Sequence, residues 1–227
     1  MNLDYIQVRP EHADALVALE AVAFPTADRG ELLSVEGVLK QCEMFPEGGF
    51  VVVDRDAGDR VVAFAMGCFV DFDFSAPQHH IDEVVGTLGS DHHQEFGEWY
   101  YGTDIAVAED YQRLGIGRQL YELRKDLIKR LNRAGMVAGG VIPGFANHKH
   151  EMTAAQYVER VAAGDLFDPT LTMQIANGFE ALGALENYWT DQAVDSWASL
   201  IVWRNPEFDA EQLAAERAGA VEGMSRG

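Results

Sequence analysis

The segment from Gln112 to Gly117 has the residue types needed to hold a phosphate group through the peptide backbone. Gly115 and Gly117 have no side chain, so a ligand can approach the main chain closely there. A leucine-rich helical pattern follows, and the N–H groups of a first helical turn are unpaired and lie at the positive end of the helix dipole. A pyrophosphate fits this arrangement, and Arg113 or Arg118 could add positive charge at its rim.

Two other phosphate-binding loops do not fit this segment. A Rossmann dinucleotide site needs three spaced glycines after a first strand, and a Walker loop needs a Gly-Lys-Ser/Thr sequence. A plain tight turn at a helix start is the remaining alternative. Such a turn would not require Val107, Gln112 and a long amphipathic helix at these spacings.

The elements that must position this loop follow from the hydrophobic pattern, which predicts strand, two helices, three strands, helix, strand, helix and two strands. The strand–helix–strand unit over 99–142 should pair in parallel with a right-handed crossover, whereas most other strands are joined as hairpins. We therefore expect an α/β protein, with a mixed (α+β) sheet and helices on both faces. The expected strands cover about 5–8, 50–54, 60–72, 99–107, 136–142, 184–188 and 196–203, and the expected helices about 10–24, 31–44, 117–133 and 170–177.

The domain organisation predicted from these elements is simple. One domain is expected over residues 1–206, with inserted loops at about 73–95 and 143–168, the second of which contains a short helix. The tail 207–227 is acidic and rich in alanine, and we expect a loosely packed helix or partial disorder there.

The stretch from Ile105 to Leu120 resembles motif A of the GCN5-related N-acetyltransferases (GNAT). That motif reads Gln or Arg, two residues, Gly, any residue, then Gly or Ala, and here Gln112, Gly115 and Gly117 fill its fixed places. The resemblance covers about residues 4–204 and implies the GNAT fold, a central splayed and mostly antiparallel sheet with helices on both faces.

The resemblance implies an acyl-CoA-dependent N-acyltransferase. Its co-substrate would be acetyl-CoA or another acyl-CoA, and its acceptor an amine of a small molecule or peptide. The pantetheine arm would pair with the fourth strand where the fourth and fifth strands splay apart, and a backbone N–H on that strand would polarise the thioester carbonyl. The implied cofactor-binding residues are Ile105, Ala106, Val107, Gln112, Arg113, Leu114, Gly115, Ile116, Gly117 and Arg118.

Acyl transfer to an amine also needs a base, and relatives often carry a carboxylate on the fourth strand. Asp104 and Glu98 are the candidates here, for proton transfer or for binding the amine. Strict alternation along the strand puts Tyr101 on the face of Ile105 and Asp104 on the other face. The alternative is that these carboxylates cap or bridge strand ends.

The leaving thiolate needs a proton, and many relatives carry a tyrosine that faces the thiol. The corresponding position here is Gln174, which cannot act as an acid. Tyr188 is the candidate substitute, although a buried tyrosine within a strand would look the same in the sequence.

A narrower resemblance comes from three later stretches of the chain. They are similar to acetyltransferase-like domains found fused to a carbon–nitrogen hydrolase of the nitrilase type. The residues after Pro206 are not expected to supply a hydrolase, so a stand-alone domain is expected. The stretches are Val141–Met152, Asp168–Thr172 and Asn177–Glu180.

Composition argues against several classes of function. The formal charge is −20, from 17 basic and 37 acidic residues, which disfavours nucleic-acid binding because a phosphate backbone would be repelled. No apolar run is long enough for a membrane span, and no secretory signal is visible. Cys42 and Cys68 fit buried thiols in a reducing compartment, so a cytoplasmic location is expected.

The histidines do not form a metal-binding pattern. His79-His80 and His92-His93 lie in the first insertion with no cysteine or glutamate framing a tetrahedral set, so no metal is expected. They would line an acceptor pocket or lie in solvent. Two other functions stay open: a catalytically silent acyl-CoA binder that regulates a partner, and an acyltransferase acting on a thiol or hydroxyl. The fold also allows a homodimer.

Overall fold

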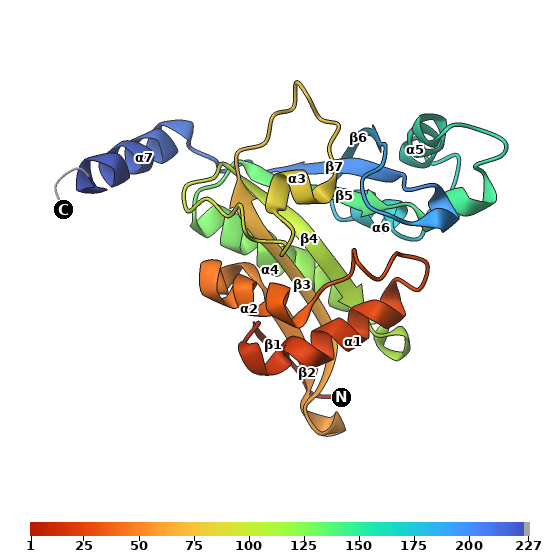
Figure 1. Cartoon of the computed structure of the whole chain (residues 1–227), viewed down its shortest axis with the longest axis horizontal. Coiled ribbons are helices and arrows are strands. Elements are labelled where there is room, and N and C mark those ends of the chain that lie inside the picture. The colour runs from red at the N-terminus through yellow and green to blue at the C-terminus, as the bar shows by residue number, and fades with distance from the viewer. Residues whose placement is uncertain (225–227) are drawn as a thin grey trace.

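The computed structural model describes residues 1–224 as a seven-stranded mixed sheet with helices on both faces (Figure 1). The strand order is β1-β2-β3-β4-β5-β7-β6, and every neighbouring pair is antiparallel except β4 and β5. This confirms the predicted mixed sheet and its parallel pair. The strands are β1 Leu3–Gln7, β2 Phe50–Asp54, β3 Arg60–Val70, β4 Trp99–Val107, β5 Gly135–Val141, β6 Glu180–Leu185 and β7 Ala198–Arg204.

The helices cover the sheet in two groups. Residues of α1 and α2 pack with Val51, Phe64 and Ala106 on one face. Residues of α4, α5 and α6 pack with the other face of the same strands, and the long α4 lies behind β3 and β4 in Figure 1. The helices are α1 Ala13–Ala23, α2 Val35–Met44, α3 Ile81–Val85, α4 Ile116–Arg130, α5 Ala154–Ala162, α6 Leu171–Ala176 and α7 Ala210–Met224.

Two segments differ from the prediction. The first insertion contains α3, which begins at Ile81 because the imidazole of the N-cap residue His80 accepts a hydrogen bond from the backbone N–H of Asp82. Histidine is not among the usual helix-capping residues, so no start signal for this helix was visible in the sequence. The strand predicted at 184–188 is instead β6, which ends at Leu185, and Tyr188 therefore lies in the loop that follows.

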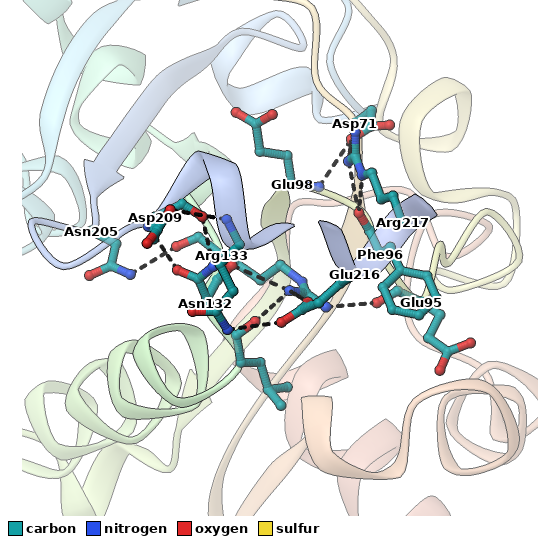
Figure 2. Close-up of polar contacts among 12 residues, drawn as sticks. Asp71, Glu95, Phe96, Glu98, Asn132, Arg133, Asn205, Asp209, Glu216 and Arg217 are labelled. Atoms are coloured by element: carbon teal, nitrogen blue, oxygen red, sulfur yellow. Dashed lines mark hydrogen bonds and ion pairs between the residues drawn. The ribbon is translucent and has the colours of Figure 1, made fainter. Parts of the chain in front are cut away.

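The C-terminal helix α7 extends away from the sheet, and contacts between residues 209 and 217 anchor its first half (Figures 1 and 2). The Asn132 side chain donates to the carbonyl of Asp209 at 2.8 Å, and the Arg133 guanidinium pairs with Glu216 at 3.3 Å. Arg217 pairs with Asp71 at 2.6 Å. The tail is therefore a helix as far as residue 224, docked through Glu216 and Arg217, and the rest of the predicted tail, 225–227, lies outside the described residues.

None of the helices within residues 1–224 is long and apolar enough to cross a membrane.

Candidate active site

The fourth and fifth strands separate after a short paired segment. β4 pairs with β5 only from Trp99 to Tyr101, opposite Gly135 to Val137. Beyond Tyr101, β4 pairs with β3 alone, so its other edge can pair with an extended ligand. This confirms the predicted splay. We call the opening the wedge, and glycines line it on both sides: Gly102 on β4 and Gly139 and Gly140 on β5.

The glycine loop leads from the end of β4 into α4. Gly115 is the N-cap of the helix with a φ of 84°, a left-handed conformation that favours glycine. Arg113 also has a positive φ of 62°, which is strained for a residue with a side chain. No side chain caps the helix and its first turn holds no acidic residue, so its N–H groups and dipole are uncompensated. The Gln112 side chain donates to the carbonyl of Val107 at 3.2 Å, which ties the loop to the strand.

A β-bulge interrupts β4 at Thr103. The register places Asp104 opposite Met66 and Gly102 opposite Gly67, which leaves Thr103 as an extra residue. Such a residue is not paired in the ladder. Its backbone is therefore available to a ligand at the point where the wedge opens.

The bulge changes which side chains share a face of the sheet. Strict alternation predicted Tyr101 on the face of Ile105, and this is wrong: Ile105 packs with residues of α4, whereas Tyr101 packs with residues of α3. The extra residue reverses the alternation. Asp104 still lies on the face opposite Ile105, toward α1, where it interacts with Glu20.

Glu20 is a buried acid that the sequence analysis missed. It is only 2% exposed, and it accepts a hydrogen bond from the backbone of Leu33. Burial, followed by the charge of Asp104, raises the pKa of the Glu20 carboxyl to about 9, so Glu20 is protonated at neutral pH. The available signal was its position, seven and four residues after the buried Ala13 and Leu16, on the core face of α1.

A small acidic cavity of about 70 Å³ lies on the α1 side of β4. Thr103 and Asp104 form its wall on the sheet, and Glu31 and Asp82 line it from the α1–α2 connection and from α3. None of its lining residues is Lys, Arg or His, and the imidazole of His80 lies just outside it, 3.7 Å from Glu31 and 3.8 Å from Asp82. A cationic group such as an ammonium would be attracted there.

A chain of buried hydrogen bonds runs behind the wedge. The Tyr101 hydroxyl donates to the Tyr188 hydroxyl at 3.2 Å, and Nε2 of His79 lies 2.6 Å from the Tyr101 oxygen. Burial raises the pKa of both phenols and lowers the pKa of His79. His79 also lines an open surface cavity of about 310 Å³. The chain thus connects Tyr188 with solvent.

The structure brings some of the predicted residues together and not others. Asp104 lies at the bulge, and Tyr188 packs against Gly139 of the wedge. Glu98 precedes the paired segment of β4, at the closed end of the strand pair, where its N–H donates to Asp71 (Figure 2). Gln174 of α6 is buried against Gly140.

Within residues 1–224 no group of three or more His, Cys, Asp or Glu is placed to hold a metal ion.

The chain belongs to the acetyltransferase (GNAT) family, whose profile matches residues 14–138. It is 30% identical over 197 residues to the uncharacterized N-acetyltransferase YkwB of Bacillus subtilis, covering 85% of this chain and 84% of that protein. It is 29% identical over 206 residues to the probable hydrolase YhcX of the same organism. That match covers 90% of this chain but only 39% of YhcX.

Solved structures share the fold at low sequence identity. The loading GNATL domain of CurA from Lyngbya majuscula is 17% identical with a TM-score of 0.77, over 90% of this chain and 98% of that domain. The GphF GNAT-like decarboxylase, solved in complex with isobutyryl-CoA, is also 17% identical with a TM-score of 0.74, over 89% and 99% of the two chains. The fold is therefore that of the GNAT-like domains, as the motif predicted.

Proposed function

We propose that this protein is an N-acyltransferase that moves an acyl group, in the simplest case acetyl, from CoA to an amine of a small molecule or peptide. The pyrophosphate of the donor binds the backbone N–H groups of Gln112–Gly117, and its pantetheine arm pairs with Ile105–Val107 in the wedge. The acceptor enters from the acidic cavity. One observation carries the proposal. Thr103 and Asp104 lie at the bulge where the wedge opens and also line the acidic cavity, so the donor site and the acceptor site meet at these two residues.

The reaction requires one bond to form and one to break. The amine nitrogen attacks the thioester carbon, and the C–S bond then breaks to release CoA as a thiolate. Asp104 takes the proton that the amine loses, and a backbone N–H at the Thr103 bulge stabilises the carbonyl oxygen. Tyr188 gives its proton to the thiolate and is reprotonated from solvent after CoA leaves the wedge.

Glu20 supports this assignment of the base. Because Glu20 holds its proton at neutral pH, its carboxyl can donate a hydrogen bond to the Asp104 side chain. The same hydrogen bond positions the Asp104 carboxylate at the wall of the cavity. An acceptor that arrives as an ammonium would meet this oriented carboxylate, and it would lose one proton to solvent before its neutral nitrogen attacks the thioester.

Known proteins support the coarser part of the proposal. The family match and the N-acetyltransferase YkwB support acyl transfer, and GphF binds isobutyryl-CoA in the same fold. The acceptor, the acyl group and the identity of the proton donor are our own assignments. A cytoplasmic location and a homodimer stay predictions.

A catalytically silent acyl-CoA binder is the second candidate. It is favoured by Gln174, which stands where many relatives carry the proton-donating tyrosine. Release of free CoA thiol from acetyl-CoA distinguishes the two functions when it is followed over a panel of primary amines. Amine-dependent release supports the enzyme, whereas tight binding of acetyl-CoA with no release across the panel supports the silent binder.

A further inference from the structure

Arg124 is a fully buried cation without an acidic partner. It extends from the middle of α4, is 2% exposed and forms no ion pair with any residue in the described part of the chain. The other buried arginine, Arg133, pairs with Glu216 and donates to three backbone carbonyls (Figure 2). A buried charge without a counterion is costly, so the isolation of Arg124 requires an explanation.

The guanidinium lies where the wedge begins. A Cβ atom placed on Gly102 would be 3.1 Å from Nη1 of Arg124 and 3.7 Å from the Cβ atom of Ala138. Gly102 and Ala138 are the first residues after the paired segments of β4 and β5. Arg124 therefore lies at the narrow end of the wedge, on the α4 face, beyond the position where the thioester of a bound donor would stop.

The atoms without partners lie on one edge of the guanidinium. Nε and Nη2 are both buried and neither has a hydrogen-bond acceptor. The ring of Tyr121 covers one face of the group, with its centroid 4.7 Å from Cζ, and the guanidinium hydrogen-bonds to the side chains of Tyr100 and Tyr121, which are neutral phenols and not counterions. Nε and Nη2 together form the fork that binds a carboxylate through two parallel hydrogen bonds.

Gln174 provides a second unpartnered group on the same face. Its Oε1 is buried without a donor and would lie 2.5 Å from a Cβ atom on Gly140. Two glycines of the wedge thus make room for polar side chains: Gly102 for Arg124 and Gly140 for Gln174. A site built only for the methyl group of acetyl would favour an apolar lining there.

We propose that the acyl group this protein accepts ends in a carboxylate, which the Arg124 guanidinium holds. The donor would be the CoA thioester of a dicarboxylic acid. This inference rests on the proposed function, because it concerns the acyl end of the same bound donor. It does not depend on the acceptor or on the identity of the base.

The test compares CoA thioesters in pairs of equal carbon number, by calorimetric titration of the full chain: malonyl with propionyl, succinyl with butyryl, and glutaryl with valeryl. In at least one pair the carboxylated member should bind about tenfold or more tightly, the amount that a hydrogen-bonded charge pair contributes. The pair with the largest preference identifies the acyl length. Binding of all thioesters with no preference in any pair would overturn the inference and leave the proposed function intact. No binding of any thioester to the folded protein would reject both.

Variants of Arg124 show which residue is responsible for the tighter binding of carboxylated thioesters. Arg124→Met should abolish it while the affinity for free CoA stays unchanged, and Arg130→Met, which removes a charge from the exposed end of α4, should leave it intact. An unchanged preference in Arg124→Met would show that another group holds the carboxylate. If Arg124→Met does not fold, Arg124→Lys keeps the charge but not the two-nitrogen fork, and the preference should fall by about tenfold. Full retention in that variant would contradict a contact made through two guanidinium nitrogens.

Discussion

The phenol ring of Tyr188 occupies the space in which a side chain at residue 139 would lie. A Cβ atom on Gly139 would be only 2.2 Å from Cζ of Tyr188, a distance that no real contact tolerates. Gly139 lies in the part of β5 that does not pair with β4. The glycine therefore allows a tyrosine from a distant loop to reach the wedge, where we place the leaving thiol.

Replacing Tyr188 by Phe should lower kcat by about 10²-fold or more, because the proton for the thiolate is lost while the ring remains. The KM for acetyl-CoA should change little, since the phenol is not part of the pyrophosphate or pantetheine site. Steady-state kinetics with the best amine of the panel measures the effects on kcat and on KM separately. Tyr157→Phe is the matched control, because it removes another buried hydroxyl, bonded to Asp168. Equal kcat values for the two variants would exclude Tyr188 as the proton donor.

Replacing Asp104 by Asn should reduce turnover about 10²-fold or more and leave the Kd for acetyl-CoA within about twofold, since the base is lost and the donor site is not. The control is Glu98→Gln, the other carboxylate that the sequence suggested. It lies at the closed end of the strand pair, so its turnover should match that of the natural protein. If Glu98→Gln lost activity and Asp104→Asn did not, Glu98 and not Asp104 would be the base.

Replacing Glu20 by Gln should change how stability depends on pH. Folded Glu20 holds its proton up to a pKa of about 9, whereas the unfolded chain releases it near 4.5, so the folded state binds more protons between these values. Stability then falls as pH rises through this window, by up to about 1.4 kcal/mol per pH unit. Glu20→Gln removes that loss and should be more stable than the natural protein at pH 8 but not at pH 4.5.

Urea unfolding at several pH values between 4.5 and 8.5 checks this prediction. Glu36→Gln, an exposed glutamate on α2, serves as the control and should keep the slope of the natural protein. Parallel stability profiles for the natural protein and Glu20→Gln would show that Glu20 is ionised in the folded state. The role of Glu20 as a hydrogen-bond donor that positions Asp104 would then be wrong.

The order of the core elements was predictable from the sequence, because strand and helix periodicity are local properties. The glycine loop was also predictable, since its chemistry depends on contiguous residues such as Gly115 and Gly117. The bulge at Thr103 was not, because it is defined by its register against β3. Glu20 and Arg124 were missed for the same reason: their burial and their partners come from elements distant in the chain.

Replacing Gly115 by Ala should destabilise the protein by about 1 kcal/mol, because residue 115 needs a left-handed φ of 84°. Gly117→Ala is the matched control. Gly117 is the second residue of α4, and an added Cβ atom would meet only Val107, at 3.9 Å. Thermal unfolding should therefore show a lower Tm for Gly115→Ala and an equal or higher Tm for Gly117→Ala. Equal losses in both would mean that the loop does not depend on this backbone conformation.

The central claim is that the loop from Gln112 to Gly117 binds the pyrophosphate of an acyl-CoA. Calorimetric titration with acetyl-CoA of the natural protein and of Gly117→Trp tests it most directly, because the indole would fill the space over the first turn of α4. We predict micromolar binding to the natural protein and none to the variant, with unchanged circular dichroism. Equal affinity in both, or no binding to the folded natural protein, would contradict the claim.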